Sequence, residues 1–373
     1  MGWTGFQYSA LRLGVAVGVA ATCHARLGAV EGRAWPLLAL GLVGAAALVI
    51  GWRDRAITIG LLAAVAGVAA FVDGAPLVLP ERDVLFTSIA LLLHLGTPVA
   101  PYGSIDARGR IDPRGDWAMP RAVGQVAWIG LALFHAARAI GGHPALDAIL
   151  PSGPVAVVVS GLAILAELAF VVATFVPRWR GHAWLAVFLL ELAFATALPG
   201  GSGALSLLLL HLYAADPAWW PGRPLARNAD ASVSDGASAR LYYDGNCGFC
   251  HRAVRMVLSE DANTPTELTL RFAPLGGPTF DAQVAVGEAT DLPDSIVLVL
   301  EDGRLLTRSA AALEIASRFG GFWRALALVG DALPSAPLDS GYDFIARIRP
   351  RLFAKPDDAC PILPPDLRAR FDA

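Results

Sequence analysis

Long apolar runs fill the first 220 residues of this 373-residue chain and limit what it can fold into. A helix that crosses a lipid bilayer needs about 20 mostly apolar residues. Runs of this kind lie at 8–23, 35–51, 57–72, 84–100, 123–140, 155–176, 183–198 and 204–215. The last run is short and 57–72 is close to the minimum, so we expect about eight transmembrane helices, with seven as the alternative. The pattern predicts a multi-span α-helical membrane bundle.

Composition divides the chain into two parts. Hydrophobic residues make up 55% of the sequence and charged residues 16%, whereas soluble domains carry about 25% charged residues. The bias lies in residues 1–220, for which a lipid bilayer is the expected partner, while 221–373 have the composition of a soluble domain. The net charge is −3 and no basic block is present, so a nucleic-acid partner is not expected.

Arginines in the loops predict the orientation of the bundle. With the N-terminus inside, eight loop arginines lie on the cytoplasmic side and four lie outside, which the positive-inside rule favours. The inner set is Arg53, Arg55, Arg108, Arg110, Arg114, Arg121, Arg178 and Arg180, and the outer set is Arg26, Arg33, Arg82 and Arg138. We therefore expect a multi-pass protein of a bacterial-type inner membrane with its C-terminal domain in the cytoplasm. An odd number of spans would place that domain on the other side.

Ionisable residues inside the apolar runs are few, and they are costly to keep there. They are Arg12, His94, His135, Arg138, Glu167, Glu191 and His211. His135 and Arg138 are three residues apart and so share a helix face. In one interpretation these side chains pair across helices and fix the packing. In the other, His135, Arg138, Glu167 and Glu191 form a polar pocket for a proton, a quinone or an acidic head group; no metal site is predicted.

The first 220 residues resemble the HTTM family, a multi-span membrane domain related to vitamin K-dependent γ-carboxylases. The resemblance is carried by the run around Arg12, the Ser104-Ile105-Asp106 loop before Pro120-Arg121, the helix with Glu167, and the ending from His211 to Trp219-Trp220. Where the carboxylase relatives have a lysine base, this chain has Phe-His-Ala-Ala-Arg at 134–138. An arginine stays protonated and is a poor general base, so carboxylation is not expected.

A second domain follows a linker. Small and polar residues at 221–238 predict a flexible linker between a membrane domain at 1–220 and a domain at 239–373. Apolar spacing and turn residues there predict strand 239–243, helix 250–259, strand 268–273, a buried strand at 295–300, a hairpin into 304–307 and helix 310–319. A strand–helix–strand unit followed by a hairpin and a helix is the order of an α/β thioredoxin-like domain.

Cys247 and Cys250 form a Cys-x-x-Cys pair where the first of these strands meets the first helix. A helix N-terminus favours a thiolate, so Cys247 is the expected nucleophile. Cys250 lies one turn further on, where it can attack a mixed disulfide and release the reduced partner. The alternatives are half of a zinc site, for which this domain offers only His251 and Cys360 as further ligands, or two unrelated cysteines.

The run Tyr-Tyr-Asp-Gly-Asn-Cys-Gly-Phe-Cys at 242–250 resembles the DCC family of thiol–disulfide oxidoreductases, named for an Asp-x-x-Cys-x-x-Cys signature. Segments 293–297, 307–311, 342–347 and 360–361 fit the same family, so the resemblance covers 239–371. It implies redox roles for Cys247 and Cys250, with Asp244 either a proton acceptor for Cys250 or only a turn former. Further candidates are Pro293 as a cis-proline opposite the cysteines, Arg308 and Ser309 beside them or at a strand–helix corner, and Cys360 as a third thiol or a structural residue.

Three functions are compatible with these sequence features. The leading one is a membrane-anchored enzyme that exchanges electrons between a protein or small-molecule disulfide and the Cys247–Cys250 pair. Its membrane domain would dock a partner or supply electrons from a quinone. The second is a transport or lipid-handling protein whose thioredoxin-like domain senses redox state. The third is a module that holds a soft metal through the two thiolates.

Overall fold

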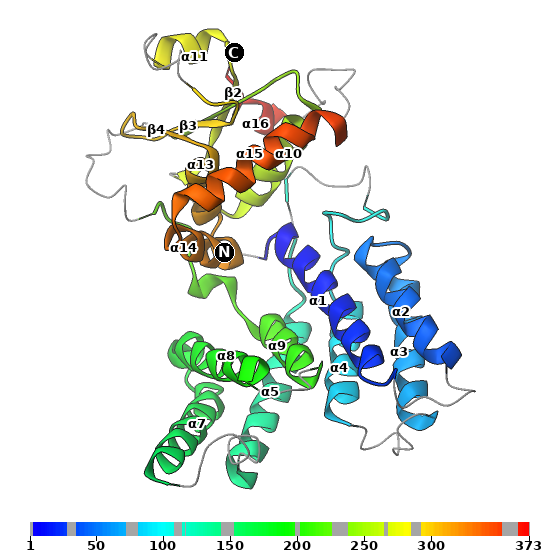
Figure 1. Cartoon of the computed structure of the whole chain (residues 1–373). Helices are drawn as coiled ribbons and strands as arrows, with labels where there is room; N and C mark the ends of the chain where they lie inside the picture. The colour runs from blue at the N-terminus through cyan, green and yellow to red at the C-terminus, as the bar shows by residue number, and fades with distance from the viewer. Residues whose placement is uncertain are drawn as a thin grey trace. The chain divides into compact units, whose positions relative to one another are not determined.

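In the computed structural model the chain is mostly helical and has a small mixed sheet near its C-terminus (Figure 1). The structure describes residues 3–27, 35–71, 81–107, 114–115, 117–142, 153–197, 202–225, 238–264, 268–284, 292–352 and 365–372. The chain forms two compact units. The helical unit comprises Phe6–Arg110 and Ala118–Asp216, and the sheet unit comprises Met1–Gly5, Ile111–Trp117 and Pro217–Ala373.

Helices of the helical unit occupy the positions of the apolar runs. They are α1 (Gly5–His24), α2 (Trp35–Val49), α3 (Asp54–Phe71), α4 (Arg82–Gly96), α5 (Arg121–Gly141), α7 (Pro154–Ala173), α8 (Arg180–Ala197) and α9 (Ser202–Ala214). Helix α9 packs against α4, α5 and α8, and α7 packs against α5 and α8. Helices α5, α7, α8 and α9 therefore enclose a common interior.

The number of membrane spans is smaller than the sequence predicts. Among the described residues, three helices are long and apolar enough to cross a bilayer, namely α3, α5 and α7. The prediction of about eight spans is therefore wrong by this measure. Helix α2 and the segment Ala204–Ala214 are apolar but shorter, and α4 has 15 residues, about 22 Å at 1.5 Å per residue against a hydrocarbon core of about 30 Å. Polar residues such as Arg12 in α1 and Glu191 in α8 interrupt the other two helices.

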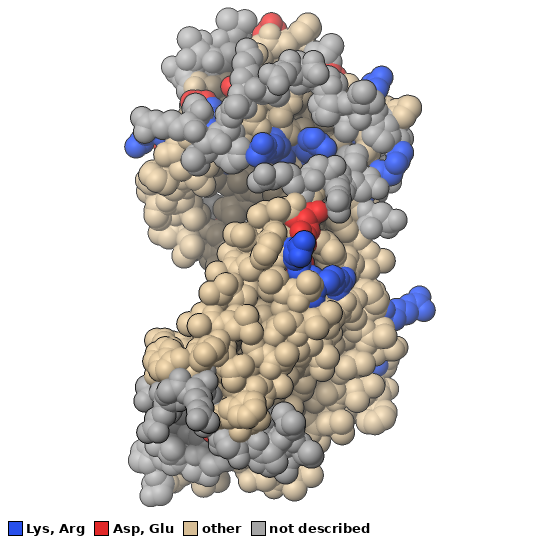
Figure 2. Space-filling model, turned by 90° about the vertical axis from the view of Figure 1, so that its right-hand side faces the viewer, with Lys and Arg blue, Asp and Glu red and all other residues tan. Residues whose placement is uncertain are grey.

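The outer surface of the helical unit is apolar. Leu133 of α5 is 68% exposed, and Val157 and Leu162 of α7 are 73% and 61% exposed. The face of this unit that Figure 2 shows is mostly uncharged. Soluble proteins rarely expose large contiguous apolar patches, so this surface and the three long apolar helices together indicate membrane association.

Buried polar contacts fix the ends of the helices in the helical unit. Arg12 is 1% exposed and donates hydrogen bonds to the carbonyl oxygens of Val49, Tyr102 and Gly103 at 3.2, 3.0 and 2.9 Å. Near the other end of α1, Arg26 donates to the Asp83 carboxylate at 2.6 Å. The start of α1 thus lies beside the loop that follows α4, and its end lies beside the start of α4, so the two helices are antiparallel.

The sheet unit has four strands in the order β2–β1–β3–β4. Strand β1 (Arg240–Tyr243) pairs in parallel with β2 (Arg271–Pro274) and antiparallel with β3 (Val297–Val299), which forms a hairpin with β4 (Leu305–Thr307). The helices are α10 (Gly248–Glu260), α11 (Pro278–Gln283), α13 (Arg308–Phe319), α14 (Gly321–Asp331), α15 (Ser335–Leu352) and α16 (Pro365–Arg368). The predicted order of strand, helix, strand, hairpin and helix is confirmed.

Side chains of the central strand β1 alternate between the two faces of the sheet, and each face has its own hydrophobic core. Leu241 of β1 packs with Val254 and Leu258 of α10 and with Ile315 of α13. Its neighbour Tyr242 points to the other face, toward Phe280 of α11 and the side chains of Val297 and Val299. Successive strand residues point to opposite faces, so a single short strand fixes the position of α10 on one side.

Helix α15 is held against the sheet and α13 by hydrogen bonds. The backbone N–H of Ser309 donates to Asp339 Oδ1 at 3.2 Å, and the Ser309 hydroxyl donates to the same oxygen. The backbone N–H of Ile296 donates to the Tyr342 hydroxyl at 3.0 Å. Helix α15 also contacts α10, which brings its C-terminal half to the helix that carries the two cysteines.

Candidate functional site

Cys247 caps the helix that follows the central strand. It has an extended backbone (φ −103°, ψ 118°), and its Sγ accepts the backbone N–H of Cys250 at 3.4 Å. The side chain is half-buried, so a partner can reach the sulfur. An N-terminal N–H and the helix dipole both favour negative charge at this position. Cys247 is therefore the more accessible sulfur of the pair and lies at the N-cap position of α10.

Cys250 lies one turn further along α10 and is buried, with 3% exposure. Burial raises the pKa of Cys250 to about 12, and the hydrogen bond and the negative charge of Cys247 act in the same direction. The positive charge of Arg349 acts the other way and lowers that pKa. At neutral pH the free Cys250 is a thiol, so it needs help to lose its proton.

Arg349 of α15 is the charged group that contacts Cys250. Its Nη1 donates to Cys250 Sγ at 3.7 Å, and its Nη2 donates to the Asp294 carboxylate. Burial lowers the pKa of Arg349, but Cys250 and Asp294 raise it more, so the guanidinium stays charged. Arg349 is not among the residues that the sequence predicts for this site. A signal was available, because Arg349 follows Tyr342 by seven residues, or two helical turns, and so shares its face of α15.

Other predicted residues have structural contacts. Asp244 Oδ1 accepts the backbone N–H of Asn246 at 2.8 Å, which is a turn contact. The chain has no cis peptide among the described residues, so Pro293 is not the predicted cis-proline; it lies in the loop before β3 rather than in a strand. Arg308 pairs with Asp343 of α15 at 3.0 Å, and Ser309 bonds Asp339. Cys360 lies outside the described residues.

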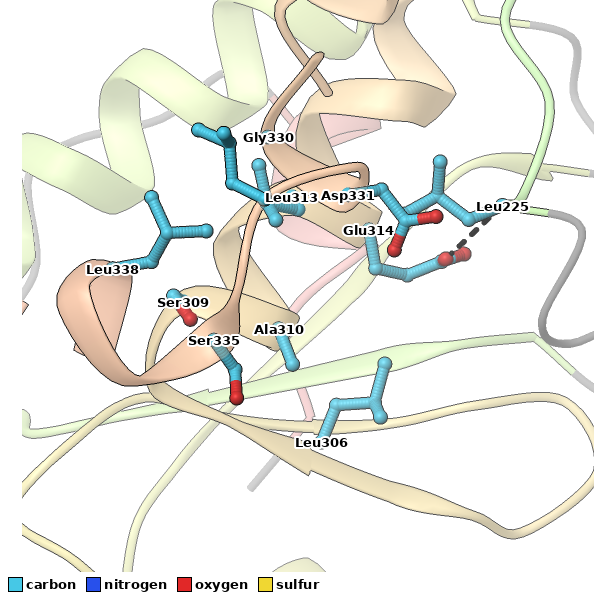
Figure 3. Close-up of a pocket in the computed structure, with 11 residues that line it drawn as sticks. Leu225, Leu306, Ser309, Ala310, Leu313, Glu314, Gly330, Asp331, Ser335 and Leu338 are labelled. Carbon is cyan, nitrogen blue, oxygen red and sulfur yellow. Dashed lines mark hydrogen bonds between the residues drawn. The ribbon is translucent and has the colours of Figure 1, made fainter. Parts of the chain in front are cut away.

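A shallow pocket in the sheet unit does not include the cysteines. Figure 3 shows its lining, which includes Leu306 of β4, Leu313 of α13, Leu338 of α15 and the carboxylates of Glu314 and Asp331. One of these, Glu314, accepts the backbone N–H of Leu225 at 3.2 Å. Neither Cys247, Cys250 nor Arg349 lines it. The two cysteines therefore lie outside this pocket, at the N-terminal end of α10.

The ionisable residues of the apolar runs do not all lie together in the structure. His94 pairs with Asp54 at 2.8 Å, and Arg12 bonds backbone carbonyls. His135, Arg138, Glu167 and Glu191 do come together, and His211 of α9 joins them. Ligand atoms of His135, Glu167 and Glu191 lie within 4.8 Å of one another. These five residues are referred to as the His135 cluster.

Comparison with known proteins bears on the sheet unit. The DCC1-like thiol-disulfide oxidoreductase family matches residues 241–355. The uncharacterized protein YuxK of Bacillus subtilis (strain 168) is 31% identical over 131 residues, which is 35% of this chain and 91% of that protein. No solved structure matches. Because the family matches the region that holds both cysteines and most of that relative is covered, the chain belongs to the DCC1-like thiol-disulfide oxidoreductase family through its C-terminal domain.

Proposed function

We propose that the sheet unit is a thioredoxin-like thiol–disulfide oxidoreductase in which Cys247 is the nucleophile and Cys250 the resolving thiol. The observation that carries the proposal is the position of the two sulfurs. Cys247 is half-buried at the start of α10, and Cys250 is buried one turn further along the helix. The family description supports the same chemistry. The substrate class is a protein or small-molecule disulfide.

The first step is attack by the Cys247 thiolate on one sulfur of the substrate disulfide. A bond forms between Cys247 Sγ and that sulfur, and the substrate S–S bond breaks. The other substrate sulfur leaves as a thiolate and takes a proton from water. The N-terminal turn of α10 stabilises Cys247 as an anion before the attack, through the N–H of Cys250.

The second step is attack by Cys250 on Cys247 Sγ in the mixed disulfide. Cys250 must first lose its proton, which ends on the second departing substrate sulfur. Arg349 cannot take that proton because it stays charged, but it stabilises the thiolate that forms on Cys250 Sγ. The products are a Cys247–Cys250 disulfide, oxidised by two electrons, and a substrate reduced to two thiols. The reverse sequence would oxidise a substrate.

The helical unit is proposed to anchor this domain in a bacterial-type inner membrane, as an HTTM-like bundle. The apolar surface and the three long apolar helices support the anchor. The same unit is proposed to couple the dithiol to a quinone held near the His135 cluster. Adding a water-soluble quinone analogue to the reduced full-length protein in lipid nanodiscs should then convert the Cys247–Cys250 dithiol to a disulfide. An unchanged thiol count would contradict the coupling.

The roles of the two cysteines can be separated by substitution. In the full-length protein, Cys247→Ser should abolish disulfide reduction, because the other thiol at the start of α10, Cys250, is buried. Cys250→Ser should instead accumulate a mixed disulfide with the substrate, since release needs the second thiol. Cys23→Ser, which changes a buried cysteine of α1, is the control and should leave turnover unchanged. Full turnover by Cys247→Ser, or one tightly bound metal ion after anaerobic purification, would refute the assignment.

Arg349 should act on the second step alone. A hydrogen bond to a charged group contributes about 1.5–3 kcal/mol, so Arg349→Met should slow partner release by roughly 10- to 100-fold at pH 7. Release should recover as the pH rises, because more Cys250 is then deprotonated. The rate of Cys247 alkylation should change little. Arg349→Lys keeps the charge and should recover part of the rate.

The control for Arg349 lies on the same helix. Arg347→Met removes an exposed arginine of α15 two residues away and should leave both steps unchanged. Equal slowing of both steps by Arg349→Met would show that the arginine maintains the fold of the site and does not stabilise the Cys250 thiolate.

The redox domain is proposed to face the cytoplasm, which requires that an even number of helices from α3 onward cross the membrane, and therefore a number other than the three candidate spans α3, α5 and α7. The start of α3 and the end of α4 lie at one end of the helical unit, because Arg55 donates to the carbonyl oxygen of His94. That end carries Arg53 and Arg55, and the positive-inside rule favours it as the cytoplasmic end. A membrane-impermeant maleimide, added to intact cells after mild reduction, should leave Cys247 unlabelled and should label it after lysis. Labelling in intact cells would place the domain outside.

A further inference from the structure

Helix α14 of the sheet unit is apolar on both its inner and its outer side. Its residues, Gly321–Asp331, are all described, and two of them, Arg324 and Asp331, are charged. A surface helix of a soluble domain turns an apolar side to the core and places charged and polar residues on the side that faces water. Residues three, four and seven positions apart share a side of a helix, so each α14 residue can be assigned to a side.

The inner side of α14 packs on α13. Ala327 is 0% exposed and lies in a hydrophobic cluster with Ala316 of α13. Trp323, one turn before Ala327, packs against the same cluster. A Cβ atom at Gly330 would lie 2.5 Å from the Leu313 side chain, so the two helices are in close contact there. Residues 323, 327 and 330 therefore define the side of α14 that faces the core.

The outer side of α14 is apolar and exposed. Val329 is 63% exposed and Leu326 is 40% exposed, and Phe322 lies one turn before Leu326 on the same side. The two charged residues, Arg324 and Asp331, are seven positions apart and lie on a different side of the helix. Exposed apolar surface of this kind marks a contact with a partner or a membrane.

The start of α14 is held by the segment that follows α9. The backbone N–H of Gly321 donates to the carbonyl oxygen of Trp220 at 2.6 Å. A Cβ atom at Gly222 would lie 1.8 Å from the carbonyl oxygen of Arg318, so the chain passes directly against the end of α13. The short 3-10 helix η3 (Pro217–Trp219) also contacts α14. Residues 217–222 and the start of α14 therefore form one connected corner of the sheet unit.

Only a short stretch of chain separates this corner from a helix of the membrane-associated unit. Helix α9 ends at Ala214, six residues before Trp220. Six residues span at most about 22 Å even when fully extended. The stretch includes Trp219 and Trp220, and tryptophan is enriched where membrane helices meet the lipid head groups. With α9 in the bilayer, the chain keeps the start of α14 close to the head groups.

Lipid is the occupant that fits the outer side of α14. An apolar helix side at a membrane surface enters the boundary between head groups and acyl chains to a depth of about 5–10 Å. Phe, Leu and Val side chains need no hydrogen-bond partner there, and both charges of α14 lie on another side of the helix. A protein partner recognised through charged groups would find none on this outer side.

We infer that α14 lies on the membrane surface, with Phe322, Leu326 and Val329 in contact with lipid acyl chains. The contact gives the sheet unit a second attachment to the bilayer, besides its chain connection to α9. The inference rests on the membrane association of the helical unit and does not depend on the proposed redox function. The competing occupants are the helical unit of the same chain and a second copy of the chain.

Photo-crosslinking of the full-length protein in phosphatidylcholine nanodiscs tests the contact. Val329→p-benzoylphenylalanine places a probe that reacts on illumination with neighbouring C–H bonds, so the peptide that carries position 329 should gain the mass of one lipid. The matched control is Ala282→p-benzoylphenylalanine, at an exposed residue of α11. Helix α11 packs on the face of the sheet opposite α13 (Figure 1), so position 282 should give no lipid adduct.

The cross-linked products identify the occupant. A cross-link from position 329 to a peptide of residues 6–216 would show that the helical unit covers α14, and a cross-link to a second chain would show a dimer interface. Either product would overturn the inference. Equal lipid adducts at positions 329 and 282, or no product at position 329, would overturn it as well.

A charge on the outer side gives an independent check. Leu326→Asp, combined with the probe at position 329, should lose most of the lipid adduct, because a carboxylate is costly among acyl chains. Ala282→Asp, combined with the same probe, is the control and should keep the adduct. An unchanged rate of Cys247 alkylation shows that the sheet unit stays folded in both variants. A full lipid adduct in the folded Leu326→Asp variant would contradict the lipid contact.

Discussion

The hydrogen bond from the backbone N–H of Cys250 to Cys247 Sγ defines the geometry of the candidate redox site. It exists because β1 ends at Tyr243 and a short turn, closed by Asp244, delivers Cys247 to the first position before α10. The turn sets the chain direction, and the apolar face of α10 packs the helix on the sheet. Together they expose one sulfur and bury the other. This asymmetry gives the two thiols different chemistry although they are only three residues apart.

Two buried arginines of the sheet unit, Arg318 and Arg349, differ in the groups that they contact. Arg318 is 0% exposed and is satisfied by Glu301 at 2.7 Å and Glu314 at 3.0 Å, so its contacts are complete without any other molecule. Arg349 is also buried, but only one of its partners is a carboxylate. The other is the sulfur of Cys250. An arginine N–H that points at a thiol forms a stronger, charge-assisted hydrogen bond when that thiol is ionised, which is the state that the proposed second step needs.

Local patterns in the sequence predicted much of the sheet unit, and long-range contacts explain the rest. The spacing of Val254, Val257 and Leu258 predicted α10, because a helix repeats every 3.6 residues whatever it packs against. Arg349 was missed because its role depends on α15 returning to α10, about 100 residues along the chain. The span count was overestimated for a related reason. Apolar runs show where helices form, but length and interruptions such as Arg12 decide which of them can cross a bilayer.

Buried charged groups of the helical unit must find their partners inside the unit, because its outer surface is apolar. Arg12 is matched by three backbone carbonyl oxygens, Arg26 by Asp83, and His94 by Asp54. In each case the partner is fixed. The His135 cluster differs, because it joins side chains of four helices in one hydrogen-bonded network. A network of this kind couples the packing of α5, α7, α8 and α9, whereas the Arg26–Asp83 and His94–Asp54 pairs each join only two segments.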